Sequence, residues 1–279
     1  MTARREIERH LKALDDIRSI MSSMKTLALL ETHKLARRLA AQNRVVASIE
    51  AAADDFRGFF PFTPSLPRDS RSVHLLFGSE RGFCGDFNEA LLKALPASET
   101  VQPPLVLAVG RKLCARLAGD ERVIVRLDGA NVAEEVEAVL NRLVDTLAAL
   151  QQQHGAFALT AVYHRADEGG VGTVHVLPPF QDPAPVPRYS FPPRLTLAPE
   201  AFFAALLDHY LFAALHALAY TSLMAENHRR LEHLEGAVRR LEQDSAELSR
   251  RRNVLRQEEI TEEIEVIMLS AESALRVRS

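Results

Sequence analysis

The chain has 279 residues, of which 47% are hydrophobic and 25% charged, which is enough apolar content for a core and one or two domains. Its formal net charge of −3 provides no positive field for nucleic acid or an acidic membrane, so neither is expected as a direct partner. Two cysteines, Cys84 and Cys114, are too few for a disulfide framework and are typical of a reducing compartment. The basic N-terminus contains Glu6 and Glu8 and no apolar stretch follows it, so no signal or transit peptide is expected.

The first predicted element is a long helix over residues 3–57, a range without proline or glycine. Apolar residues recur there at steps of three and four, which predicts a narrow stripe close to a heptad repeat. The stripe consists of Leu14, Ile17, Met21, Met24, Ala28, Leu35, Val46, Ile49, Ala53 and Phe56. At 1.5 Å per residue the helix would be about 80 Å long, and it needs a partner because a lone amphipathic helix cannot bury its stripe. Pro61, Pro64 and Pro67 are expected to end it.

The middle of the chain, residues 73–177, alternates short β-rich runs with helical runs, which predicts βαβ units and a mostly parallel sheet. The expected strands are VHLLFG, PLVLAVG, RVIVRLDG, AFALTAVYH and GTVHVL, and the expected helices are FNEALLKAL, RKLCARLA and AEEVEAVLNRLVDTLAALQQQ. Residues 178–199 hold eight of the fourteen prolines and are expected to form an extended connector with at most an edge strand, PRLTL.

A second long helix is predicted from about 200 to 275. Its stripe consists of Leu231, Leu234, Val238, Leu241, Ser245, Leu248, Arg252 and Leu255, and then drifts to Ile260, Ile264 and Ile267. Polar residues fall at or near the stripes at Glu31, Ser245, Arg252 and Glu259. Such positions reduce stability and fix register, or mark a helix that faces something else.

The two long helices are expected to pair as an antiparallel coiled coil, because the ends of an inserted domain usually lie close together. The predicted fold class is therefore α/β, with a long coiled coil of N- and C-terminal helices and an inserted Rossmann-like domain. The expected divisions are the N-terminal helix at 1–60, the α/β domain at 70–180, the proline-rich connector at 181–200 and the C-terminal helix at 201–279.

The stretch FFAALLDHYLFAALHALAY at 202–220 approaches the length of a membrane span. Asp208, His209 and His216 interrupt it, which favours the buried start of a helix over a transmembrane segment.

The loop GSERGFCG at 78–85 lies between a predicted strand and a predicted helix, where many nucleotide sites begin. It lacks the lysine and Ser/Thr of a P-loop and the spacing of the dinucleotide fingerprint, although Arg81 and the helix N-terminus could meet a phosphate. The favoured alternative is a glycine turn, with Asp86 or Asn88 capping the following helix. Cys84 could be a nucleophile, but no base is close in sequence, which favours a buried structural thiol.

No catalytic, cofactor or metal site is predicted from the residues alone. His209 and His216 are seven residues apart but belong to no tight ligand set, and the charges around 250–263 are typical of a solvated helix face. Three alternatives stay open at this point: a long, charged two-helix rod that carries a globular domain, a nucleotide-binding or redox α/β domain with dimerising helical arms, and a coiled-coil scaffold with an inserted domain.

Four segments resemble one family. The run NVLRQEEITEEI at 253–264 resembles the signature N-x-x-R-Q-x-x-I-T-x-E-[IL] of the gamma subunit of F-type ATP synthases. The segment ERGFCGDFN resembles that family's D-R-G-L-C-G-G-x-N, and YSFPP at 189–193 is similar to its Y-x-[FY]-E-P. The family's first helix is similar to the N-terminal stretch REIERHLKALDDIRSIMSSMKTLALLETHKLARRLAA. The resemblance covers essentially the whole chain.

The resemblance implies a central rotor shaft that couples proton- or sodium-driven rotation to ATP synthesis or hydrolysis on the alpha and beta subunits. It implies no catalytic residue and no cofactor on this chain, and alpha, beta, epsilon and the c-subunit ring as partners. It also implies a peripheral position at the cytoplasmic face of the bacterial membrane, with contact to the membrane only through the complex.

Six residues match family positions that contact partners or support those contacts. They are Met24, Arg230, Arg256, Gln257, Thr261 and Glu263. The chain also departs from the family: Leu29, Leu30 and Glu31 replace A-S-K, Val266 replaces a glutamate, and residues 269–273 replace a run of small residues. The resemblance implies that the end of the coiled coil turns inside an apolar sleeve of the catalytic head. These departures affect how that end would fit the sleeve. They favour a divergent branch such as the alternate, sodium-type ATPases, although the ion is chosen by the c ring.

Overall fold

The structure is a computed structural model of the chain. It describes residues 2–60, 66–67, 70–95, 104–166, 170–182, 186–187 and 189–276, with side chains described between residues 4 and 269. The elements in chain order are α1 (Thr2–Arg57), β1 (Ser72–Phe77), α2 (Phe87–Lys93), β2 (Leu105–Val109), α3 (Arg111–Arg116), β3 (Val123–Leu127), the 3-10 turn η1 (Ala133–Glu135), α4 (Val136–His154), β4 (Ala158–His164), β5 (Val171–Leu177) and α5 (Pro199–Arg276).

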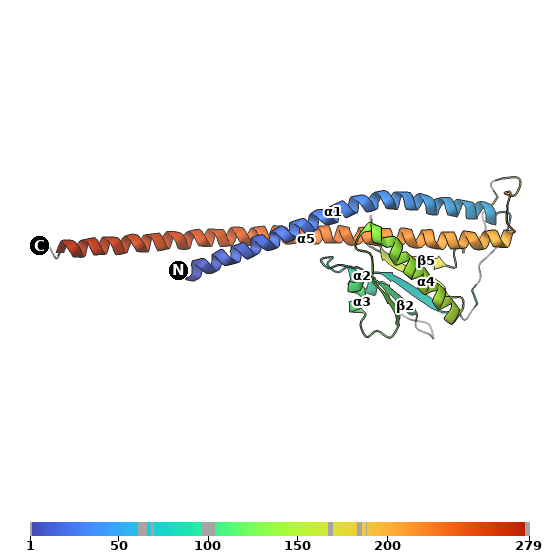
Figure 1. The fold of residues 1–279 in the computed structure, drawn as a ribbon, viewed down its shortest axis with the longest axis horizontal. Coiled ribbons are helices and arrows are strands. Elements are labelled where there is room, and N and C mark those ends of the chain that lie inside the picture. The colour runs from blue at the N-terminus through green and yellow to red at the C-terminus, as the bar shows by residue number, and fades with distance from the viewer. Residues whose placement is uncertain are drawn as a thin grey trace. The chain divides into compact units, whose positions relative to one another are not determined.

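The chain divides into two compact units. The two-helix unit consists of Met1–Leu27 and Glu232–Ser279, and the sheet unit consists of Ala28–Leu231. The two boundaries between the units, after Leu27 and after Leu231, fall inside α1 and α5 respectively, so each of these helices contributes to both units (Figure 1). The mixed α/β fold with long helices at both ends, expected from the sequence, is confirmed.

Within the described residues the sheet has five strands, in the order β3-β2-β1-β4-β5. The first four are parallel, with Leu75 of β1 opposite Leu107 of β2 and Ala161 of β4. Only β5, at one edge, is antiparallel to its neighbour β4, which agrees with the expectation of a mostly parallel sheet. The chain order therefore reverses direction between β1 and β4, the place where open α/β sheets usually bind ligands.

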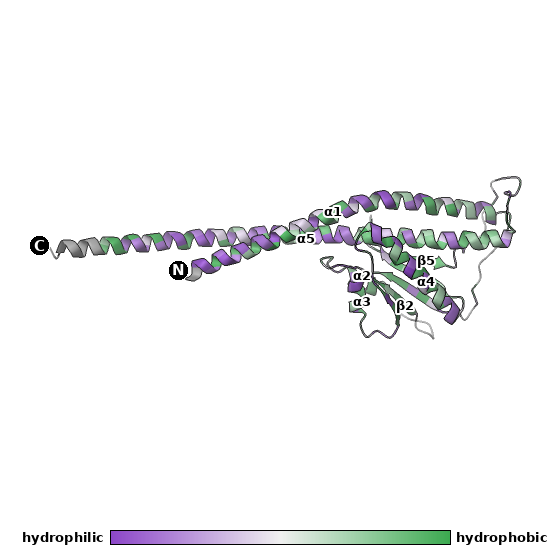
Figure 2. Ribbon diagram, viewed as in Figure 1, coloured by the Kyte–Doolittle hydropathy of each residue, from purple (hydrophilic) through white to green (hydrophobic). Residues whose placement is uncertain are grey.

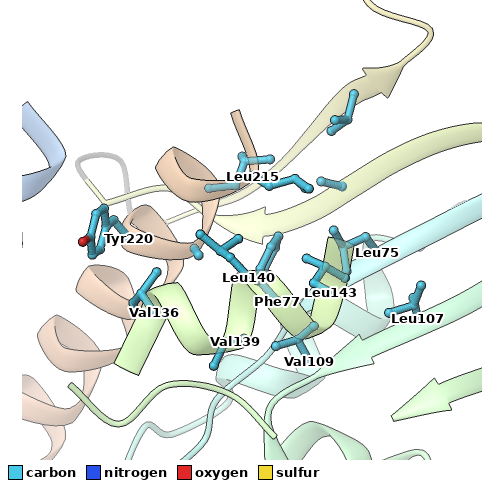
Figure 3. Packing of buried hydrophobic residues seen from close by; sticks show 14 of the residues in the cluster. Leu75, Phe77, Leu107, Val109, Val136, Val139, Leu140, Leu143, Leu215 and Tyr220 are labelled. Carbon is cyan, nitrogen blue, oxygen red and sulfur yellow. The ribbon is translucent and has the colours of Figure 1, made fainter. Parts of the chain in front are cut away.

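Both faces of the sheet are buried, which explains why β1 and β2 are buried along nearly their whole length instead of at every second residue. Leu75 and Phe77 belong to the larger core, together with α4 and residues of α1 and α5, whereas Leu76 belongs to a smaller core under α2 and α3. Figure 3 shows residues of α4 and α5 packed over Leu75 and Phe77. In Figure 2 the strands are mostly green, while the long helices mix purple and green.

Within the sheet unit, α1 and α5 run antiparallel. The Gln42 side-chain amide donates to the Ala213 carbonyl at 3.1 Å, and the Phe56 ring lies 5.1 Å from that of Phe202. Leu35 of α1 and Leu215 of α5 are both fully buried in the larger core. The stripe predicted on the first helix therefore has its partner in α5 here.

Within the two-helix unit the pairing is also antiparallel. Arg4 Nη1 lies 2.9 Å from Glu259 Oε2, and Lys25 Nζ lies 3.6 Å from Glu235 Oε1. Seven of the eight stripe positions predicted on α5, from Leu234 to Leu255, lie in this unit, and all seven are buried or half-buried; Leu231, in the sheet unit, is half-buried.

Three expectations about local structure were wrong or fall outside what is described. Ile17, expected on the α1 stripe, is 42% exposed. Helix α1 ends at Arg57, directly before Gly58, so proline does not end it, and Pro61 and Pro64 lie outside the described residues. Residues 189–198 contain no strand, so PRLTL does not form the sheet edge, which β5 occupies.

Candidate functional site

The loop after β1, residues 78–86, lies at the carboxyl ends of the strands and is the natural place to look for a ligand. A side chain at Gly78 would place its Cβ 2.3 Å from the Leu113 Cβ, so only glycine allows α3 to pack this closely. Phe83 and Gly85 both have positive φ, at 64° and 60°, which lets the loop turn sharply before α2. The glycine turn expected from the sequence is thus present.

Two backbone amides of this loop are already bonded to a carboxylate of the same chain. The backbone N–H groups of Glu80 and Arg81 donate to the two carboxylate oxygens of Glu226 on α5, at 3.0 and 3.1 Å. Glu226 is only 3% exposed. Burial raises the pKa of its carboxyl, whereas Arg230 and the two amides act in the opposite direction. A phosphate in this turn would have to displace Glu226, so the geometry opposes nucleotide binding here.

Glu80 extends the same arrangement to the neighbouring strands. One of its carboxylate oxygens accepts the backbone N–H of Arg111, after β2, at 2.8 Å and that of Gly129, after β3, at 2.7 Å. Glu80 is 5% exposed, and the Arg111 guanidinium lies 3.5 Å from its other oxygen. Two buried carboxylates therefore join the carboxyl ends of three parallel strands to α5.

Arg230 completes the cluster from α5. Its guanidinium bonds to Glu226 one turn earlier, donates to the Asn227 side chain at 2.8 Å and donates to the Gly82 carbonyl at 3.2 Å. The side chain is 5% exposed. The sequence resemblance placed Arg230 among the partner contacts. In this chain its hydrogen bonds are made internally, and a direct contact with a partner stays a prediction.

Cys84 lies beside Arg230, with the guanidinium 3.5 Å from its sulfur, and is 5% exposed. Burial, followed by the negative charge of Glu226, raises the pKa of this thiol to about 12. The thiol therefore stays protonated at neutral pH and cannot act as a nucleophile. The structural role favoured by the sequence agrees with this environment.

The expected caps of α2 are not made. Asp86 occupies the N-cap position without a side-chain hydrogen bond. Asn88 instead accepts the Ser79 backbone N–H at 3.0 Å and donates to the Ser79 hydroxyl at 2.9 Å. Asn88 thus stabilises the turn after β1, a long-range role that the helix-start pattern does not reveal.

The histidines and carboxylates form no metal-binding group of three or more within the described residues. His209 is exposed, and His216 stacks on Tyr220 with the ring centroids 4.6 Å apart. The polar stripe residue Glu31 has a structural partner: its carboxylate accepts the Ala133 N–H, at the start of η1, at 3.3 Å.

In the two-helix unit the predicted partner contacts form an exposed surface on α5. Arg256, Gln257, Thr261 and Glu263 are exposed, and Met24 on α1 is half-buried. The Thr261 hydroxyl donates to the Gln257 carbonyl at 2.9 Å, so those two residues are joined along the helix. A groove of about 720 Å³ between α1 and α5 adjoins this surface and is lined by Arg4, Arg5, Glu8, Glu259, Glu262, Glu263, Val266 and Ile267.

Helix α5 also carries the apolar stretch considered as a membrane span. Within the described residues it is the one helix long and apolar enough, by length and composition, to cross a membrane. Leu215, Leu218 and Ala219 from this stretch lie in the larger core of the sheet unit. Only 28% of the apolar window is buried, however, so this helix is packed along one face and the burial on all sides expected from the sequence is wrong.

The sequence analysis missed the two buried carboxylates, Glu80 and Glu226. One signal was available: Ser222, Glu226 and Arg230 are four residues apart, on one face of a helix whose preceding turns are apolar. A charged residue at such a position needs a partner, because burying an unpaired charge is costly. The identity of that partner, a turn 145 residues away, is not contained in any local pattern.

Comparisons with known proteins agree on one family. The family model described as ATP synthase matches residues 3–275. The ATP synthase gamma chain of Parafrankia sp. is 26% identical, with 95% of each chain covered, and that of Saccharopolyspora erythraea is 26% identical, with 92% of this chain and 94% of the relative covered.

Solved structures share the fold of the chain. A chain in the OSCP/F1/c-ring structure of the Euglena gracilis mitochondrial ATP synthase in rotational state 3 has a TM-score of 0.67 at 13% identity, covering 98% of this chain and 94% of that one. A chain in the central stalk/c-ring structure from the Tetrahymena thermophila mitochondrial enzyme has a TM-score of 0.59 at 16% identity, covering 78% and 99%.

Proposed function

Because the chain belongs to the ATP synthase gamma chain family, we propose that it is the central rotor-shaft subunit of an F-type ATP synthase. The observation that carries this proposal is that one family model matches both terminal helices and the sheet between them. The chain would couple ion-driven rotation to ATP synthesis or hydrolysis on the catalytic head. The two-helix unit would serve as the part that turns inside the head, and the sheet unit as the part that meets the c ring.

The exposed end of α5 supports a partner at the two-helix unit. Arg4, close to the start of α1, bonds to Glu259, and residues 260–269 of α5 beyond it are exposed. These include apolar side chains that are 46–66% exposed: Ile260, Ile264, Val266, Ile267, Met268 and Leu269. Neighbouring large apolar residues exposed in this way mark an interaction surface, and the alpha and beta subunits would cover it.

The polar residues beside this apolar end are proposed to make the specific contacts. Arg256 and Gln257 are exposed and present donors, and Glu263 lies on the same helix less than two turns later. Thr261 supports this row through its bond to the Gln257 carbonyl, and Met24 contributes from α1. Charge-assisted hydrogen bonds to a partner would give this surface its specificity.

Arg230 would act differently from the other five residues. It is buried and bonded to Glu226, Asn227 and Gly82, so we propose that it acts by holding the loop at residues 78–86 in shape. A substitution of Arg230 would then weaken the binding of any partner that contacts this loop, although that partner does not contact the Arg230 guanidinium.

The chain is a subunit of an ATPase complex, and we propose that it is itself non-catalytic. The best support is Glu226, which occupies the amide donors that a phosphate would need. We further propose a peripheral location on the cytoplasmic face of the bacterial membrane, together with alpha, beta, epsilon and the c ring, and no cofactor on this chain.

The test is co-expression with the alpha and beta subunits of the same organism. The expected result is co-purification of a complex whose ATP hydrolysis turns a bead attached to an exposed residue of the sheet unit. The pure chain alone should hydrolyse no ATP. Failure to co-purify, or turnover by the pure chain that disappears in an Arg81→Ala variant, would contradict the proposal.

A further inference from the structure

Three polar side chains on α5 bond in succession to the segment that leaves β1. The Ser222 hydroxyl donates to the Phe77 carbonyl at 3.0 Å, Glu226 accepts two amides of the following turn, and Arg230 Nε donates to the Gly82 carbonyl at 3.2 Å. Ser222, Glu226 and Arg230 are each four residues apart and therefore lie on one face of the helix. All three are at most 5% exposed.

We propose that this ladder, which we call the α5 latch, prevents α5 from turning against the sheet under load, and that Glu226 is its positioning residue. The proposal rests on the rotor function proposed above. It assigns to Glu226 the transmission of force between the shaft helix and the sheet unit, and it assigns to Glu226 no contact with any partner.

The remaining contacts between α5 and the sheet cannot perform this task equally well. Leu215, Leu218 and Leu223 contribute apolar burial, which is non-directional and changes little when a helix turns slightly about its axis. Hydrogen bonds weaken steeply once their angle or length changes. In a buried environment the charge-assisted ones are the strongest, so a twisting load would fall mainly on Glu226 and Arg230.

Glu80 spreads this load over the sheet. The turn that Glu226 holds includes Glu80, whose own carboxylate is bonded to the amides of Arg111 and Gly129. A force on Glu226 is therefore distributed to the chain after β1, β2 and β3 at once. Gly110 allows this close assembly: its φ is +113°, and a Cβ there would lie 2.6 Å from the Gly78 carbonyl oxygen.

The first part of the test uses hydrogen exchange on the pure full-length chain. Glu226→Gln keeps the shape of the side chain but replaces one acceptor oxygen by an NH2 group that cannot accept the amide N–H. We expect the Glu80 and Arg81 amides to exchange at least tenfold faster, while those of Leu75 and Leu76 in β1 are unchanged. The matched control is Asp208→Asn, an exposed carboxylate on the same helix of the same unit. Unchanged exchange at Glu80 and Arg81 would overturn the latch.

The second part uses the complete enzyme in vesicles, with ATP hydrolysis and the ATP-driven membrane potential measured on the same sample. We expect Glu226→Gln and Glu226→Ala to hydrolyse ATP within about twofold of the parent while the potential formed per ATP falls at least threefold. Glu226→Asp, which keeps the charge, should recover part of the loss. A merely structural role would lower both measurements together.

The outcomes separate the two proposals. Equal coupling in Glu226→Gln and the parent, or loss of complex assembly by Glu226→Gln, would overturn the latch. If the parent chain itself fails to assemble with alpha and beta, the rotor function is wrong, and the proposed role of the α5 latch in transmitting force is then wrong as well. The exchange result on the pure chain still shows in that case whether Glu226 holds the turn.

Discussion

Arg4 and Glu259 lie 2.9 Å apart, although 255 residues separate them in the chain. The two helices are antiparallel, so a residue further along α1 is paired with one closer to the start of α5: Lys25 forms its ion pair with Glu235. Both ion pairs are substantially exposed and contribute little to stability. Their value is geometric, because they fix the register in which the two helices face each other.

This register predicts an intramolecular crosslink. Leu14 and Leu248 are both half-buried and lie between the two ion pairs at corresponding distances along the helices. The double variant Leu14→Cys/Leu248→Cys should form a crosslink within one chain when treated with a short bismaleimide. The measurement is gel mobility and peptide mass, with the unsubstituted chain as control. Crosslinks that form only between chains would show that the helical arms dimerise and would favour the coiled-coil scaffold.

The exposed donors on α5 predict a loss of function confined to the complex. Arg256→Ala/Gln257→Ala should weaken assembly with alpha and beta, or slow ATP hydrolysis about tenfold, since charge-assisted hydrogen bonds contribute roughly 1.5–3 kcal/mol. The free chain should unfold as before, because exposed helix residues contribute little on their own. Steady-state hydrolysis and complex yield measure the effect.

The matched control for that pair is Glu242→Ala/Gln243→Ala, two exposed residues on the same helix. It should assemble and turn over like the parent. Equal behaviour of the two double variants would mean that Arg256 and Gln257 make no energetic contact, and the assignment of partner contacts from the family motif would have to be withdrawn.

Two arginine–glutamate pairs with the same i,i+4 spacing predict very different stabilities. Arg230→Met leaves the buried Glu226 carboxylate without its counter-charge and should lower the free energy of unfolding by about 3–5 kcal/mol. Arg239→Met breaks an exposed pair with Glu235 and should cost no more than about 0.5 kcal/mol. Urea denaturation of both variants makes the comparison. Similar midpoints would show that the buried cluster contributes little.

Three buried or half-buried histidines predict the pH dependence of stability. Burial lowers the pKa of His74, His164 and His216 below the ordinary value, so the unfolded chain takes up protons first as the pH falls. Stability should therefore be complete above about pH 6.5 and should decrease as the pH is lowered from there toward the depressed pKa values. The measurement is the urea midpoint from pH 7.5 to 5.5.

The control for the histidines is His164→Gln. The His164 ring nitrogen lies 2.8 Å from the Phe87 carbonyl oxygen, a bond that glutamine can replace without titrating. This variant should show a shallower dependence on pH than the parent. A midpoint that rises between pH 7.5 and 5.5 would be inconsistent with the burial of these rings.

Much of the fold was contained in local patterns. The eight-residue stripe from Leu231 to Leu255 follows from a spacing of three and four, and the strands follow from short apolar runs, because in both cases burial is set by neighbours along the chain. Ile17 shows the limit: it continues the α1 pattern but is exposed. Two helices paired along a narrow seam bury only the residues that face the partner.

The candidate site was less predictable, for a physical reason. Glu80, Asn88 and Glu226 look like surface residues in a sequence, and each is instead bonded to backbone groups or side chains far away in the chain or across a turn. Such contacts depend on how the strand ends are brought together by the sheet. The resemblance to a family identified the chain, but it did not reveal what these side chains do.

The exposed apolar end of α5 affects how long a newly made chain persists before it assembles with its partners. Until a partner covers it, the part of α5 that bears Val266, Ile267, Met268 and Leu269 at 61–66% exposure is open to proteases and chaperones that recognise exposed apolar residues. A copy made in excess of its partners would therefore be removed from that end. Stoichiometry in the cell would be enforced by degradation of the copies that have no partner.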